Sequence, residues 1–237
     1  MTGRVLIGGH RGCGRTDATG GRRDVPQENS RQALELAFEL GADFVEVDLC
    51  LDADGAGWLV HSSRLSEHVS NPPAEFLDQL TTQDVACLRG LGGQGLMPLV
   101  DLLRDFSHCR VNVELKFRQG SGRDSGNELD RLDLDQWPER WWLSSFDWLL
   151  LDQAHRRWPS APKGLLFDED WCGALDWHRA RPSFWLHPEV SLLPTVEAWP
   201  SAPVVAWSLA VDAGSVDRRC HGWITDRLER CVVTPRR

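Results

Sequence analysis

Short apolar segments recur along the chain, and most are separated by stretches whose apolar residues repeat with a helical period. Strands that alternate with helices predict a parallel α/β sheet. The predicted strands are residues 4–9, 43–49, 58–61, 111–117, 141–146, 163–167, 183–187, 204–209 and 222–225. The chain has 237 residues, close to the ~250 of a typical (β/α)8 barrel. We therefore expect an α/β fold of the TIM-barrel type, in one domain over residues 1–237.

Helix-start signals support this alternation. Asn29 or Ser30 can cap a helix that follows the first predicted strand. Thr81 and Asp84 have the spacing of a capping box, and Asp147 can cap a helix that follows the strand at 141–146. The predicted helices thus begin where a barrel requires them.

The second and third predicted strands are too close in sequence for a parallel connection. About eight residues separate them, whereas a parallel crossover needs a dozen or more. Asp54-Gly55 lies between them and favours a tight hairpin. We predict that residues 58–61 form a short antiparallel hairpin arm after strand 2, and that the other eight strands form the barrel. The pairing places His61 opposite Asp48, unless a bulge at Gly57 shifts it by one residue.

Charge and composition exclude several classes of protein. A formal net charge of −9 opposes bulk electrostatic binding to nucleic acid or to an anionic membrane. No apolar run approaches the ~20 residues of a membrane span, so no stable membrane anchoring is expected. The seven cysteines are scattered without a CxxC motif, which indicates reduced thiols in a cytoplasmic protein.

Acidic and basic side chains fall at the carboxyl ends of the predicted strands, where barrel active sites lie. Glu46 and Asp48 are two residues apart in one strand and face the same way, as do Glu114 and Lys116 in another. Three carboxylates at one barrel mouth repel each other, and a hard divalent cation with oxygen ligands removes that repulsion. The alternative is a structural ion-pair network through Arg11 and Lys116.

Two of the eight histidines, His10 and His61, fall at the same mouth. A histidine pair beside a metal site suits a general base and a general acid near neutral pH. The remaining histidines are expected at the surface or in packing, with His187 the least certain because it ends a predicted strand. These are His68, His108, His155, His178, His187 and His221.

Several short motifs run in order over nearly the whole chain. They are HRG at 10–12, PQENS at 26–30, GADFVEVD at 41–48, DG at 54–55, VH at 60–61, LT at 80–81, MPL at 97–99, VELK at 113–116, SF at 145–146, VAWS at 205–208 and GWITD at 222–226. The ordered set resembles the motifs of the glycerophosphodiester phosphodiesterase family. One departure is Ser62, which follows His61 where the family usually has Asp.

The resemblance implies a TIM barrel with a divalent metal, Mg²⁺ or Ca²⁺, bound by Glu46, Asp48 and Glu114. It also implies that His10 and His61 are the acid/base pair. On the resemblance alone His10 is assigned as base and His61 as acid.

The implied reaction is hydrolysis of a small-molecule glycerophosphodiester to sn-glycerol 3-phosphate and an alcohol. Arg11 and Lys116 would hold the phosphate, with Trp207 near the substrate. The attacking group could be water or the glycerol 2-hydroxyl. Two other functions stay open, a related enzyme for larger lipid phosphodiesters and a non-catalytic binding barrel. No pattern in the sequence specifies the head group or the oligomeric state.

Overall fold

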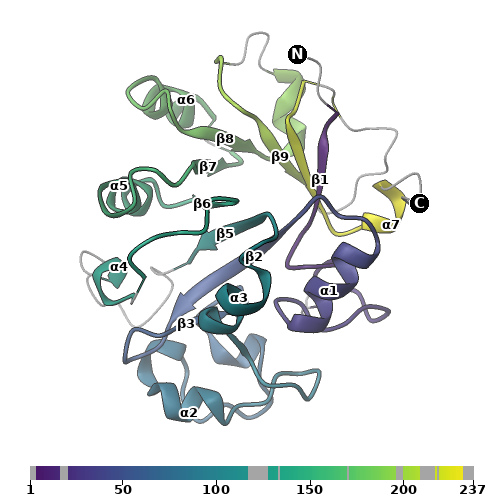
Figure 1. Ribbon diagram of the computed structural model, residues 1–237, viewed down its shortest axis with the longest axis vertical. Coiled ribbons are helices and arrows are strands. Elements are labelled where there is room, and N and C mark those ends of the chain that lie inside the picture. The colour runs from purple at the N-terminus through teal and green to yellow at the C-terminus, as the bar shows by residue number, and fades with distance from the viewer. Residues whose placement is uncertain are drawn as a thin grey trace.

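Eight parallel strands form a nearly closed barrel in the computed structural model, which describes residues 4–16, 21–116, 128–132, 134–169, 171–195, 200–208, 217 and 219–231 (Figure 1). The barrel strands are β1 (Leu6–Gly9), β2 (Phe44–Leu51), β5 (Val111–Leu115), β6 (Trp141–Ser145), β7 (Lys163–Phe167), β8 (Trp185–Pro188), β9 (Val205–Ser208) and β10 (Gly222–Thr225). Their order is β8-β7-β6-β5-β2-β1-β10-β9. Two isolated parallel bridges, Leu186 with Val204 and Glu189 with Trp207, join the two ends of this order. The predicted TIM-type barrel is therefore confirmed.

Helices ring the outside of the barrel in Figure 1. They are α1 (Arg31–Glu39), α3 (Leu99–Phe106), α4 (Glu128–Arg131), α5 (Trp148–Arg157), α6 (Trp171–Arg179) and α7 (Leu228–Cys231). Between β2 and β5 the chain also forms the short helix α2 (Thr82–Ala86) and the 3-10 turns η1 (Leu65–Glu67) and η2 (Leu77–Gln79), and a further 3-10 turn, η4 (Val190–Thr195), follows β8. Three predicted caps are present, because Ser30 accepts from Ala33 N, Thr81 forms its capping box and Asp147 caps α5. Each cap satisfies amide groups that the first helical turn leaves without a partner.

The predicted arm exists, but its register is shifted by one residue. The short strand β3 (Gly57–Leu59) pairs antiparallel with β2, with Leu59 opposite Leu49, and a further strand β4 (Met97–Pro98) pairs with β3. This register continues to Val60, not His61, opposite Asp48, which is the one-residue shift that the sequence left open. Gly57 pairs regularly with Leu51, however, so a bulge at Gly57 is not its cause.

The side chain of Asp52 explains the shift in register. Its Oδ1 accepts hydrogen bonds from the backbone N of Asp54 and of Ala56, each at 2.9 Å. Gly55 adopts a φ of +93° within this turn, a left-handed conformation that suits glycine. The connection is therefore a three-residue loop between Asp52 and Ala56 instead of the two-residue turn that the sequence suggested.

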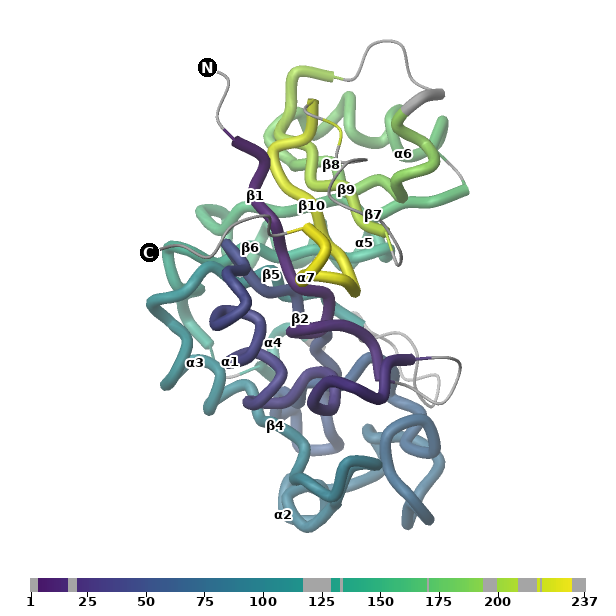
Figure 2. Tube along the Cα trace, turned by 90° about the vertical axis from the view of Figure 1, so that its right-hand side faces the viewer, coloured from purple at the N-terminus to yellow at the C-terminus, as the bar shows by residue number. Residues whose placement is uncertain are grey.

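The chain from β3 to β4 packs around a small apolar cluster separate from the main core. That cluster contains Cys50, Trp58, Val60, Leu65, Val69, Leu77, Leu80, Val85 and Leu88. In both Figure 1 and Figure 2 the α2 region lies at the edge of the molecule, outside the ring of barrel helices. We call residues 57–98 the arm lobe.

The barrel interior is aromatic toward the amino ends of the strands. Phe44, Trp142, Val205 and Ile224 form a buried cluster although they come from four separate strands, which only the barrel axis can bring together. The rings of Phe44 and Trp142 lie 5.0 Å apart. The polar side chains of the barrel instead gather at the carboxyl ends of the strands. Two strand predictions extended to Phe117 and Leu209, which lie outside the described residues.

Candidate active site

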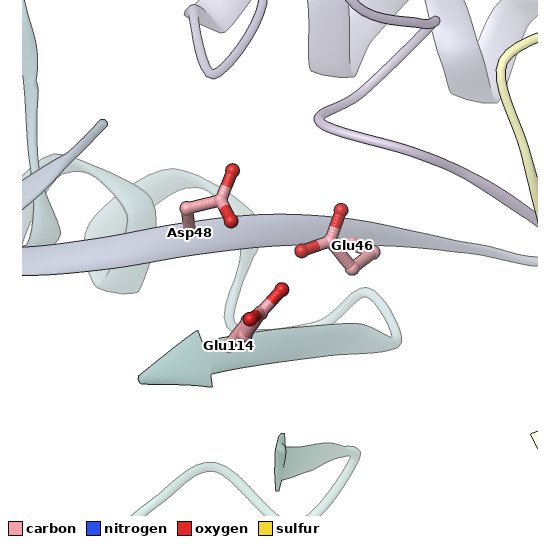
Figure 3. Close-up of side chains that lie close together, drawn as sticks. All are labelled: Glu46, Asp48 and Glu114. Atoms are coloured by element: carbon pink, nitrogen blue, oxygen red, sulfur yellow. The ribbon is translucent and has the colours of Figure 1, made fainter. Parts of the chain in front are cut away.

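Three buried carboxylates converge at the carboxyl ends of two neighbouring strands. Glu46 and Asp48 lie two residues apart on β2, and Glu114 lies beside Asp48 on β5. One oxygen atom from each side chain lies within 4.8 Å of the others. Figure 3 shows the carboxylates of Glu46, Asp48 and Glu114 facing a common space. The predicted clustering of these residues is thus present.

Two cations lie against this cluster. Lys116 Nζ is 2.6 Å from Glu114 Oε1 and 3.6 Å from Asp48 Oδ1, and Arg11 Nε is 3.3 Å from Asp48 Oδ2. Arg11 also donates through its backbone N to Glu46 Oε2 at 2.9 Å. The ion-pair network that the sequence left as an alternative is therefore present, in addition to the carboxylate cluster.

The network leaves the cluster short of positive charge. Burial, followed by repulsion from Asp48, raises the pKa of Glu46 well above its ordinary value. Burial also raises the pKa of Glu114, although Lys116 opposes the shift. The pKa of Asp48 is instead lowered, because the charges of Arg11 and Lys116 outweigh its burial. The cations thus stabilise one carboxylate and leave two that favour protonation.

The donor set fits a hard divalent cation. Glu46 Oε1 and Asp48 Oδ1 are buried and have no hydrogen-bond partner among the described residues. A buried carboxylate oxygen without a partner is costly, and it signals a missing cation or donor. Carboxylate oxygens from three residues are ligands that Mg²⁺ and Ca²⁺ both accept.

His10 follows β1 and is held by a carboxylate. Its Nδ1 is 2.8 Å from Asp226 Oδ1, and its Nε2 is 3.9 Å from Glu46 Oε2. Asp226 is buried, yet its pKa falls to about 2, because the hydrogen bond and charge of His10 and the contacts of Arg15 outweigh the burial. An ionised Asp226 accepts a hydrogen bond from the Nδ1–H group of His10, so that the Nε2 atom, on the side of the carboxylate cluster, is the nitrogen without a proton. Sequence reasoning placed Asp226 in a motif but gave it no role.

His61 follows the arm strand β3 and reaches the same cavity as His10 and Glu46. Burial lowers the pKa of His61 to about 3, and the opposing charge of Asp48 only partly offsets the burial. The next residue, Ser62, donates its backbone N to the Nε2 atom of buried His68 at 3.2 Å. Ser62 Oγ accepts from Arg64 N at 3.1 Å, so this serine stabilises the turn of the arm.

A cavity of about 250 Å³ collects the predicted residues at the barrel mouth. Its lining is His10, Arg11, Arg15, Glu46, His61, Glu114, Lys116, Ser144, Phe146, Leu166, Trp207 and Ile224. Of the predicted site residues only Asp48 lies outside this lining, because it is fully buried behind it. Larger cavities of about 300, 470 and 550 Å³ are lined by none of the predicted site residues.

One wall of the cavity is apolar. The rings of Phe146 and Trp207 meet edge to face at 5.7 Å, and Trp207 Nε1 donates to His187 O at 3.1 Å. Phe146 also lies 5.7 Å below Lys116 Nζ. The sequence indicated Trp207 but not Phe146 or Arg15. Phe146 lies one residue after β6 and Arg15 in the loop after β1, so the carboxyl-end rule alone could have included both.

Other histidines are packed into the protein, as expected. His178 Nε2 lies 2.9 Å from Phe184 O. His187 is fully buried on β8, and its ring nitrogens have no partner in the described part of the chain. Burial lowers the pKa of His187 to about 3, so it is neutral.

The barrel and the acidic, basic and imidazole groups at its carboxyl end define a TIM-barrel protein with the site location typical of barrel enzymes. Residues 10–198 match the model of the glycerophosphoryl diester phosphodiesterase family. The chain belongs to that family.

Known relatives agree with this membership. The curated protein "Probable glycerophosphodiester phosphodiesterase 2" of Mycobacterium tuberculosis is 33% identical over 88 residues, which are 37% of this chain and 33% of the relative. The match thus spans about a third of that protein's length.

Solved structures share the fold. A phosphodiesterase of Oleispira antarctica, in complex with its product sn-glycerol-3-phosphate, has a TM-score of 0.71 at 19% identity, over 96% of this chain and 95% of the other. A glycerophosphodiester phosphodiesterase of Thermotoga maritima has a TM-score of 0.67 at 21% identity, over 96% of each chain. At such identities the likeness concerns the fold. No helix in the described segments is long and apolar enough to cross a membrane.

Proposed function

We propose that this protein hydrolyses glycerophosphodiesters to sn-glycerol 3-phosphate and an alcohol, with a divalent metal as cofactor. One observation carries the proposal. Two imidazoles, two carboxylates of the three-carboxylate cluster and three cationic side chains line a single cavity at the carboxyl end of a barrel. This combination suits hydrolysis of a phosphodiester, because charge must be neutralised and two protons must move.

Glu46, Asp48 and Glu114 would hold the metal, Mg²⁺ or Ca²⁺. A bound divalent ion would supply positive charge that stabilises the extra negative charge of the phosphoryl transition state. Arg11 and Lys116 border the same cluster and are charged, since nearby carboxylates raise the pKa of each side chain. Both cations are therefore suited to bind the phosphate oxygens.

His10 acts as the general base in this proposal. Asp226 holds the Nδ1 proton, so the Nε2 lone pair can accept a proton from the attacking hydroxyl, whether that belongs to water or to the glycerol 2-hydroxyl. The ionised Asp226 then stabilises the imidazolium that forms. His61 acts as the acid and gives a proton to the leaving alcohol oxygen. A bound phosphodiester raises the pKa of His61 by its negative charge, in the direction that this role needs.

The two alternative functions are less well supported. A binding barrel needs no pair of titrating imidazoles beside a carboxylate cluster. A cavity of about 250 Å³ is of a size that suits a small glycerophosphodiester, and the family that the chain belongs to acts on such diesters. A cytoplasmic location stays a prediction from the cysteine pattern.

The test is an assay of the purified protein with glycerophosphocholine, with release of sn-glycerol 3-phosphate measured by a coupled dehydrogenase. Activity should vanish on addition of EDTA and return on addition of excess Mg²⁺ or Ca²⁺. Activity that persists in EDTA would contradict the metal. Absence of activity toward glycerophosphocholine and related diesters under all metals would contradict the proposed reaction.

A further inference from the structure

Arg15 is a third cation of the cavity. It lines the same cavity as His10 and Trp207, and its side chain is 28% exposed. Its backbone N donates to Asp226 Oδ1 at 2.9 Å, and its Nε donates to Asp226 Oδ2 at 3.0 Å. The two outer guanidinium nitrogens make no hydrogen bond to any described residue. One edge of the guanidinium is thus fixed, and the other is available to a ligand.

The neighbouring backbone fixes Arg15 beside Asp226. Gly14 has a φ of +118°, and a Cβ at this position would lie 2.7 Å from Asp226 O. Only glycine allows this close approach, which brings the Arg15 amide to the Asp226 carboxylate. Arg22 N donates to Arg15 O at 2.7 Å, and Arg22 Nη1 donates to Asp226 O at 2.9 Å. Arg15 is therefore preorganised, so a ligand that binds it orders little further structure.

Arg15 differs from the other two cations in how far it is neutralised. Arg11 lies between Glu28 and Asp48, and Lys116 lies between Glu114 and Asp48. Among the described residues, Arg15 contacts one carboxylate, Asp226, and that carboxylate also holds His10.

The outer edge of the Arg15 guanidinium is therefore the least saturated cationic group of this cavity among the described residues. An anion that enters the cavity would meet the least competition from protein carboxylates at this edge.

We propose that Arg15 is an anion-binding residue of this cavity, whose outer guanidinium nitrogens donate to a phosphate or carboxylate oxygen of the substrate. The identity of that substrate rests on the proposed function. Two sources share this chemistry. One is the phosphate of the diester, and the other is a second anionic group on the alcohol.

The test compares Arg15→Gln with the wild type on two substrates, glycerophosphoethanolamine and glycerophosphoserine, which differ by one carboxylate. Arg23→Gln is the matched control, because Arg23 lies in the same loop but lines a different cavity, with Thr16 and His68. Arg15→Gln should raise KM by about 10-fold, as expected for loss of one hydrogen bond to a charged group. Any fall in kcat should be smaller than this, because Asp226 keeps its own contact with His10. Arg15→Lys should restore part of the loss, and Arg23→Gln should behave as the wild type.

The two substrates identify the source of the anion. An equal rise in KM on both assigns Arg15 to the diester phosphate, and a rise confined to glycerophosphoserine assigns it to the second anionic group. An unchanged KM on both substrates would overturn the proposal. So would a fall in kcat at constant KM, because Arg15 would then act only by holding Asp226 and His10.

Binding of inorganic phosphate, measured by calorimetry, separates this proposal from the proposed function. Arg15→Gln should weaken phosphate binding about 10-fold relative to the wild type and to Arg23→Gln. If the wild type hydrolyses neither substrate while this difference holds, the proposed function fails and the anion site stands. If the wild type hydrolyses both while Arg15→Gln changes neither KM nor phosphate binding, the anion site fails.

Discussion

The two histidines of the site are supported by different parts of the molecule. His10 follows a barrel strand and is fixed by Asp226, which in turn is held by Arg15. His61 comes from the arm lobe, which has its own small apolar cluster, and its ring makes no hydrogen bond to the described residues. Asp226 orients His10 directly, whereas packing and backbone contacts of the arm lobe place His61.

The difference suits two different steps of one reaction. A base must present one nitrogen lone pair at a fixed place, and a carboxylate on the opposite nitrogen achieves this. Burial lowers the pKa of His61 to about 3, so His61 is neutral at pH 7 until an anion approaches. The bound substrate would then itself promote the protonation of His61, in keeping with the acid role proposed for it.

The largest expected effect is on turnover, when either histidine is removed. His10→Ala and His61→Ala should each lower turnover of glycerophosphocholine by about 10²–10⁴-fold, with metal binding nearly unchanged. A substrate with a nitrophenyl leaving group hardly needs an acid. The turnover of His61→Ala, measured by nitrophenol release, should therefore return toward the wild-type value on that substrate. The turnover of His10→Ala should stay low. Recovery of His10→Ala instead would reverse the two roles.

A smaller effect concerns the cluster that lies between both histidines. Glu114→Gln keeps the shape of the side chain but removes one charge from the set of Glu46, Asp48 and Glu114. Metal affinity, measured by calorimetry, and activity should fall together, by about 10- to 100-fold at limiting metal, and excess metal should restore part of the activity. Full activity of this variant at limiting metal would count against Glu114 as a ligand.

The next effect concerns Asp226, the residue that orients His10. Asp226→Asn removes the charged acceptor of the Nδ1 proton, so the imidazole loses its fixed tautomer. Turnover should fall by about 10- to 100-fold, the cost of one hydrogen bond to a charged group. The loss should persist on the nitrophenyl substrate, because the base is affected and not the acid. Recovery there would show that Asp226 serves the His61 step.

The smallest effect is on stability, and it depends on pH. The pKa of Asp226 falls from 3.8 in the unfolded chain to about 2 in the folded protein. The ionised carboxylate therefore stabilises the fold above about pH 4, by on the order of 2 kcal/mol, and this is lost as the pH falls through 2. At pH 7 the free energy of unfolding, measured with urea, should be larger for the wild type than for Asp226→Asn by about this amount. The gap should narrow between pH 4 and pH 2, and a constant gap would mean that Asp226 stays ionised throughout.

Much of the barrel could be predicted from the sequence, because local patterns determine it. A strand needs a short apolar run, and a helix needs an apolar face and a cap, and each is visible within about ten residues. The carboxyl-end rule then places His10, Glu46 and Glu114 at one mouth without knowledge of any distance. The antiparallel direction of β3 also followed from loop length alone.

Only the tertiary structure decided how the site is supported. The pairing of His10 with Asp226 joins residues 216 positions apart, and it depends on β1 lying beside β10 in the closed barrel. The register of the arm is an exception, because the Asp52 side chain that sets it binds Asp54 and Ala56 within the same turn, a local contact that the turn preference of Asp54-Gly55 did not reveal. Arg15 reaches the cavity because Gly14 lets two distant loops touch. Sequence patterns report which way a side chain faces along its own strand or helix, whereas contacts between distant segments arise only when the barrel closes.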